Sequence, residues 1–207
     1  RLRQVKRHPK GQRSPCRVSQ KTWQCNAPKI PLTLDLPILT FHALAIGTEA
    51  SMIGLGPAAL MATGASEVWA AQLLSIFFIG FLLARVSLFF VAHLLPPFRI
   101  STLAVAGVGL SSLGAATLSP DIFFVIMGFC AGAFFPTIYV AATRRMGDNA
   151  RVSPIIIAAG LIGGILIPLV LSQIMGQMGQ FGFFWLFAGL MAAMTLWVIT
   201  YGRRYNR

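Results

Sequence analysis

The sequence has few charged residues, and acidic residues are the scarcest of them. Only 11% of the 207 residues are charged, and Asp and Glu together number 5. Hydrophobic residues make up 56% of the chain, and the mean hydropathy is +0.74. A water-soluble domain of this length needs more polar surface than this composition supplies. The scarcity of charge therefore excludes an ordinary soluble fold and favours a membrane protein.

The chain also lacks the motifs of a membrane enzyme or a metal site. Cys16 and Cys25 lie in a basic segment at no metal-ligand spacing, and Cys130 lies in an apolar run. There is no Walker phosphate-binding sequence, no Gly-x-Ser-Gly protease motif and no His/Cys cluster. The three aspartates stand at span edges or in loops, which disfavours an aspartyl protease. We therefore expect no enzyme, no cofactor and no metal.

Long apolar runs dominate the rest of the sequence. Each has about 20 residues or more, which is enough for a helix to cross about 30 Å of hydrocarbon. The breaks between them are short and polar or turn-forming. The sequence predicts an all-α membrane protein with six transmembrane helices in one bundle over 38–201. The predicted spans are 38–63, 69–93, 99–118, 120–143, 152–175 and 181–201.

Basic residues are distributed unevenly along the chain. Nine of the 17 Lys and Arg fall in the first 29 residues, and the others, except Arg85, lie in alternate loops or the C-terminal segment. By the positive-inside rule this predicts that both termini are cytoplasmic, in a bacterial inner membrane or a plasma membrane. Residues 1–37 are then a flexible basic cytoplasmic loop or tail, and 202–207 a basic cytoplasmic C-terminus. An organellar transit peptide is an alternative for the tail. A nucleic-acid partner is not expected, because long apolar spans follow the basic run.

Glycine and proline interrupt the first and fourth spans at similar places. We expect the six spans to form two three-helix repeats, of which these two spans are the first helices. Paired interruptions at corresponding positions of two repeats point to the central pathway of a transporter, although kinks can also serve packing alone. We expect helix breaks or gating positions at Gly54, Pro57, Pro136 and Pro168. Glycines four apart, Gly128 with Gly132 and Gly160 with Gly164, predict close helix packing, and Gly163 lies beside the second pair.

Glu49 is an acidic residue near the middle of a span. A carboxylate there is costly unless it is protonated, paired or facing water, so it is a candidate for substrate or proton contact. Met52 and Gly56 share its helix face. The alternative is a structural hydrogen bond to a neighbouring helix.

Arg85 is the one basic residue inside a span. It lies within a side-chain length of the cytoplasmic boundary, so snorkelling to that boundary is slightly favoured over a role in gating or substrate contact. Gln72, Thr137 and Tyr139 add hydrogen-bonding groups to a pathway, or are satisfied packing residues.

Several segments of the chain resemble parts of a known family, in the same order along the chain. They are Gly47 through Gly54, Phe77 to Arg85, Gly128 to Thr137 with Arg144 to Gly147, and Ala158 to Pro168. They resemble helices seven, eight, ten and eleven of the major facilitator superfamily, nearest its fucose permease-like branch of fucose:proton symporters. The loop 93–99 departs from the family pattern because it has no acidic residue.

This resemblance implies one half of the major facilitator fold, namely its C-terminal six helices. The implied function is secondary active transport of a small polar solute, with a sugar as one candidate, by alternating access. The implied partners are the lipid bilayer, the solute with a coupling proton, and a missing N-terminal six-helix half in the same or another chain. The first and fourth spans would line the path, helped by the second and fifth, and the aromatic-rich sixth would face lipid. The alternative is a degenerate or subunit-like half-transporter that acts as a membrane interaction protein.

Overall fold

The structure is a computed structural model that describes residues 16–19, 22–25, 34–147 and 149–205. The chain forms two compact units, Arg1–Pro31 and Leu32–Arg207. The first unit contains an antiparallel hairpin of β1 (Cys16–Ser19) and β2 (Thr22–Cys25), which the sequence did not predict. The expected flexibility of the basic tail falls largely on residues outside the described ranges.

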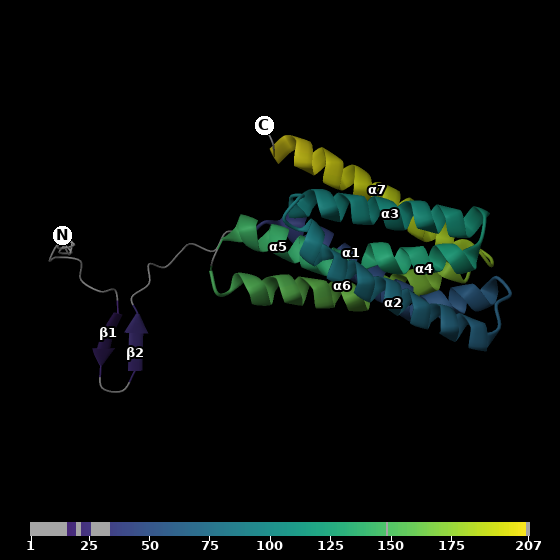
Figure 1. Cartoon of the computed structure of the whole chain (residues 1–207), viewed down its shortest axis with the longest axis horizontal. Helices are drawn as coiled ribbons and strands as arrows, with labels where there is room; N and C mark the ends of the chain where they lie inside the picture. Colours follow the sequence, from purple (N-terminus) through teal and green to yellow (C-terminus); the bar gives the residue numbers. More distant parts are fainter. Residues whose placement is uncertain (1–15, 20–21, 26–33, 148, 206–207) are drawn as a thin grey trace, which may run out of the picture. The chain divides into compact units, whose positions relative to one another are not determined.

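The second unit is a bundle of helices whose axes run roughly along one direction (Figure 1). The described helices are α1 (Leu36–Ala62), α2 (Glu67–Val91), α3 (Pro97–Thr117), α4 (Pro120–Ala131), α5 (Phe134–Met146), α6 (Val152–Met175) and α7 (Gly182–Tyr205). The segments α4 and α5 together form the fourth span, so six helical segments are long and apolar enough to cross a membrane. The prediction of six spans is confirmed, with ends that differ by four residues or fewer. The helix α7 takes in Arg203 and Arg204, which were expected to lie beyond the last helix.

Local chemistry sets several of the helix ends. The Asp35 side chain accepts a hydrogen bond from the Ile38 N–H at 3.3 Å, and the Ser66 side chain accepts one from the Trp69 N–H at 3.2 Å. These side chains satisfy amide groups that the first turns of α1 and α2 leave without helical partners. At the end of α5, Gly147 has a φ of 82°, a conformation that glycine adopts without steric cost.

Only one of the expected proline interruptions breaks a helix. The fourth span ends one helix at Ala131 and starts the next at Phe134. Pro136 accounts for this break, because it has no N–H and its ring meets the carbonyl four residues earlier. The breaks predicted at Gly54, Pro57 and Pro168 are corrected, since α1 and α6 run without interruption through these residues. A proline removes one helical hydrogen bond, and packing against neighbouring helices keeps the rest of each helix intact.

The most extensive contact in the bundle joins α1 to α6. A Cβ atom on Gly163 would overlap the carbonyl oxygen of Ala43, and one on Gly160 would lie 3.0 Å from Nε2 of His42. Gly164 differs, because a Cβ atom there would have its nearest neighbours at 4.0 Å. The first two glycines therefore allow the backbones of α1 and α6 to approach closely, and Gly164 does not limit that approach.

A second glycine contact joins α4 to α2. A Cβ atom on Gly128 would lie 2.6 Å from the carbonyl oxygen of Phe77, and one on Gly132 would overlap the carbonyl oxygen of Phe81. Backbone lies directly against backbone at both positions, so no side chain can move aside to admit a larger residue. The first and fourth spans are thus each held to another helix by glycines.

The aromatic residues of the last span are largely buried rather than exposed to lipid. Phe183, Phe184 and Phe187 are each 2% exposed or less, whereas Trp185 is 48% exposed. The Phe183 ring contacts the rings of both Phe184 and Phe187, and α7 packs extensively on α3. The expectation that the aromatic residues of this span face lipid is therefore corrected. Composition alone did not distinguish a packing face from a lipid face.

The glycine contacts predict a difference between two neighbouring substitutions on α6. We expect Gly163→Ala to lower the free energy of unfolding by about 1–3 kcal/mol, because the added methyl group meets the backbone of α1. Gly164→Ala is the matched control, and we expect it to change stability by less than about 0.5 kcal/mol. Thermal unfolding of both variants in the same detergent measures the difference. Equal stability of the two variants would contradict the close contact at Gly163.

Candidate functional site

Glu49 lies near the middle of α1. The distance from Leu36, the first residue of the helix, is about 20 Å along the axis. The Glu49 side chain is 14% exposed, and its Oε1 atom lies 3.9 Å from Nη2 of Arg85 on α2. Within the described residues, its Oε2 atom is buried and has no hydrogen-bond partner. The carboxylate is thus only partly satisfied by the bundle.

The Arg85 side chain extends along α2 away from the helix end at Val91. Its Cζ atom lies 4.5 Å from the ring centre of Phe81, which is one turn farther from the end of α2 at Val91. This position combines the ion pair with a cation–π contact. Snorkelling toward the nearer helix end, which the sequence slightly favoured, is therefore corrected. Glu49 supplies a partner for the guanidinium group that the distance from the helix end did not reveal.

The Glu49–Arg85 ion pair is long and accessible. Its separation is at the limit of a salt bridge, and the Arg85 side chain is 44% exposed. Exposed pairs of this kind contribute little to stability, about 0–1 kcal/mol. An unpartnered buried oxygen on the same carboxylate costs free energy. The arrangement suits a pair that exchanges partners better than one that holds two helices together.

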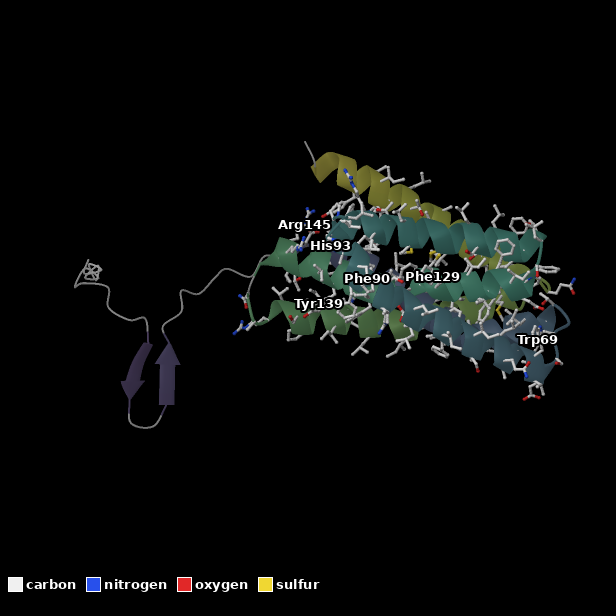
Figure 2. All side chains as sticks on the ribbon, in the orientation of Figure 1. Trp69, Phe90, His93, Phe129, Tyr139 and Arg145 are labelled. Atoms are coloured by element: carbon white, nitrogen blue, oxygen red, sulfur yellow. The ribbon has the colours of Figure 1, made fainter. Side chains whose placement is uncertain are left out.

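A hollow of about 630 Å³ lies beside Arg85, between the last turns of α2 and the start of α5. Its volume falls within the range of small-molecule sites, about 300–1,000 Å³. Most of its wall is apolar, and the charged or titratable residues that line it are Arg85 and His93. Figure 2 shows His93 near the same end of the bundle as Arg145, and Trp69 near the opposite end. The lining residues are Arg85, Leu88, Phe89, Ala92, His93, Phe135 and Pro136.

His42 is a buried polar residue whose importance the sequence did not reveal. It is 0% exposed, and neither ring nitrogen has a hydrogen-bond partner in the described part of the chain. Its ring centre lies 5.8 Å from that of Phe135, which also lines the hollow. His42 precedes Glu49 by two helical turns and shares its face of α1. The seven-residue spacing from Glu49 was the signal in the sequence that could have identified His42.

The remaining expected pathway residues are spread through the bundle. Met52 and Gly56 lie buried beyond Glu49 on α1, and a Cβ atom on Gly56 would lie 2.5 Å from the Phe124 ring. Gln72 is exposed on α2, about 20 Å along the axis from Arg85. The structure therefore brings Glu49 and Arg85 together but leaves Gln72 in the opposite half of the bundle.

Thr137 and Tyr139 are satisfied by other contacts on the bundle. The Thr137 hydroxyl donates to the carbonyl oxygen of Ala133 at 2.6 Å, within its own chain segment. The Tyr139 hydroxyl forms a 2.7 Å hydrogen bond with that of Ser153, which ties α5 to α6. Neither residue joins the Glu49–Arg85 pair.

Another polar cluster closes the end of the bundle at which α1 begins. Asp35 forms an ion pair with Arg145 and accepts hydrogen bonds from the Tyr201 hydroxyl at 3.0 and 2.9 Å. The Arg145 guanidinium also lies 4.8 Å from the centre of the Tyr201 ring. Three helix ends, those of α1, α5 and α7, meet in this cluster. It joins residues 166 positions apart, so no local pattern in the sequence could have identified it.

Among the residues that the structure describes, no group of three or more His, Cys, Asp or Glu could hold a metal ion. Neither a protein-family model nor a curated protein matches this chain. Its class therefore follows from the fold: the six apolar helical segments define a multi-pass membrane protein. Its most distinctive polar feature is a charge pair between two of those segments.

The geometry of the pair predicts how stability responds to loss of the Glu49 charge. We expect Glu49→Gln to keep the free energy of unfolding within about 1 kcal/mol of the original chain, because the ion pair is 3.9 Å long and its arginine is 44% exposed. The matched control is Asp35→Asn, which weakens a closer ion pair and the Tyr201 hydrogen bonds, and we expect it to cost about 1–3 kcal/mol. Thermal unfolding in detergent compares the two variants. A larger loss for Glu49→Gln than for Asp35→Asn would show that Glu49 has a structural role.

Proposed function

We propose that this chain supplies the C-terminal six-helix half of a major facilitator superfamily transporter. The transporter moves a small polar solute across a membrane by alternating access, with a proton as the coupling ion, and the chain is not an enzyme. The observation that carries this proposal is the Glu49–Arg85 pair, which joins α1 and α2 inside the membrane-spanning bundle. Ionisable groups at such depth are costly, and in membrane proteins they mark solute and ion pathways.

The pattern of helix contacts supports two three-helix repeats. If the first three spans are superposed on the last three, α1 corresponds to the fourth span, α2 to α6, and α3 to α7. The contact of α1 with α6 then becomes that of the fourth span with α2, and the contact of α3 with α7 maps onto itself. All three contacts are extensive. The contact of α3 with the fourth span is also extensive, whereas its counterpart between α7 and α1 is slight. Two repeats related by a twofold axis therefore account for the first three contacts but not for the contact of α3 with the fourth span.

The exposed surface of α1 at Gly54 and Ala58, here called the open strip, supports a second bundle that faces this one. The helix α1 contacts α2, α4, α5, α6 and α7, so it is the most central helix of the bundle. Gly54 on α1 is nevertheless exposed, and a Cβ atom there would meet nothing within 4 Å. An opening beside a central helix suits a water-filled path between two six-helix halves. The facing half is in the same or another chain.

The charge pattern supports an orientation for the bundle. Arg99, Arg144, Arg145 and Arg151 lie in or beside the loops at the end where α1 begins. By the positive-inside rule we assign this end, and both termini, to the cytoplasm of a bacterial inner membrane or a plasma membrane.

The alternative is a half-transporter that acts as a membrane interaction protein without transport. In that case the open strip of α1 is a dry interface, and no water reaches it. Water access therefore separates the two functions.

Cysteine labelling tests the proposed path. In a chain with Cys16, Cys25 and Cys130 changed to Ser, we expect Gly54→Cys to react with a membrane-impermeant maleimide applied from the side of the α1–α2 loop. Leu110→Cys on α3 is the matched control, because it is 71% exposed and lies at a similar depth, about 11 Å from the corresponding helix end. We expect it to face lipid and to remain unlabelled, since thiolates do not form in hydrocarbon.

The labelling is measured in intact membranes by mass shift. If the maleimide labels neither Gly54→Cys nor Leu110→Cys, the water-filled path is contradicted. That result would favour the membrane interaction protein without transport.

A further inference from the structure

We propose that the hollow beside Arg85 binds an organic carboxylate with an apolar body, and that the solute carboxylate replaces Glu49 as the partner of Arg85. This inference rests on the proposed transport function and names its class of solute. It differs from the neutral sugar that the family resemblance implied.

The charge of the hollow favours an anion. None of its lining residues is acidic, and Arg85 provides a permanent positive charge. Within the described residues, the guanidinium group contacts Glu49 at 3.9 Å and the Phe81 ring, and no hydrogen bond uses its donors. An arginine has five N–H donors in a fork that matches a carboxylate. Arg85 can therefore form two close hydrogen bonds with an incoming carboxylate where it now has one long ion pair.

The walls of the hollow favour an apolar body. Leu88, Phe89, Phe135 and Pro136 surround Arg85 with aliphatic and aromatic surface. A sugar placed against these residues would leave most of its hydroxyl groups without partners, and each such group costs free energy on burial. An aromatic or aliphatic group would instead bury apolar area against the same residues. One end of the solute is thus matched to Arg85 and the other end to the phenylalanine side chains.

Competition between Glu49 and the solute gives this inference a specific signature. Both carboxylates need the same guanidinium group, so removing one should strengthen the hold of the other. Loss of the Glu49 charge therefore increases solute affinity, whereas loss of the Arg85 charge decreases it. If overall positive charge alone attracted anions, the loss of any basic residue would lower the affinity, and the loss of Glu49 would not be specific to Arg85.

The experiment uses the full chain in nanodiscs of uncharged phosphatidylcholine. The probe is radiolabelled phenylacetate, followed by equilibrium dialysis, and phenylacetamide is the uncharged competitor of the same shape. We expect phenylacetamide to bind about 10-fold more weakly, because it lacks the charge-assisted hydrogen bonds to Arg85. We expect Arg85→Gln to raise the dissociation constant for phenylacetate by about 10-fold. We expect Glu49→Gln to lower it by about 3-fold or more.

Two control variants separate this site from general charge and from misfolding. Arg99→Gln removes an exposed positive charge near the same end of the bundle but outside the hollow, and we expect unchanged binding. Phe135→Ala removes one apolar wall, and we expect phenylacetate to bind more weakly with little effect on acetate. An unchanged melting temperature for Arg85→Gln shows that its effect on binding is not a loss of fold.

Three outcomes would overturn the inference. One is equal binding, or no binding, of phenylacetate and phenylacetamide. Another is weaker binding to Glu49→Gln than to the original chain. The third is displacement of phenylacetate by added phosphatidylglycerol that depends on Arg85, which would assign the hollow to a lipid headgroup. If phenylacetate does not bind but Gly54→Cys is labelled from water, the proposed transport function stands and only the proposed class of solute is wrong.

Discussion

The close contact between α1 and α6 is the constraint on which the site depends. A Cβ atom on Gly163 would overlap the backbone of Ala43, so the two helices touch without side chains between them. Lipid tails are as apolar as leucine, and helices in a membrane associate through such tight packing rather than through hydrophobic burial. In this contact His42 lies beside Gly160 of α6 and the Phe135 ring of α5, and Glu49 is directed toward Arg85 of α2. The position of the carboxylate therefore follows from glycines on another helix.

Polar groups inside the bundle fall into two sets. Ser51, Ser112 and Thr137 donate to carbonyl oxygens three or four residues earlier, so their burial leaves no donor unsatisfied. His42, Glu49 and Ser101 have buried polar atoms without partners in the described part of the chain, and of these His42 and Glu49 lie beside the hollow or its arginine. Such atoms lower stability, and proteins tend to keep them where activity requires them. The difference separates residues that the fold accommodates from residues that point to a function.

The sequence predicted the spans well and the side-chain arrangement poorly, for one physical reason. Hydropathy depends on composition over about 20 residues, so the limits of the six spans could be found from the sequence alone. The direction of Arg85, the buried face of α7 and the Asp35–Tyr201 contact depend on which helices are neighbours. The proline breaks needed the same information, because packing decides whether a helix stays continuous at a proline. The midspan position of Glu49 was predictable, whereas its partner was not.

The weakness of the Glu49–Arg85 pair bears on how such a site can work. A tight, fully buried ion pair would resist exchange, since separating its members leaves uncompensated charges in a low-dielectric interior. The observed pair is 3.9 Å apart, and the arginine is accessible from the hollow, so its guanidinium can reach a new partner before it leaves the old one completely. The Asp35–Arg145–Tyr201 cluster has the opposite character, with several close contacts that hold three helix ends together. The bundle thus places its close polar contacts at an end and its long ion pair within the span, where the proposed movement of a solute would need a contact that can exchange.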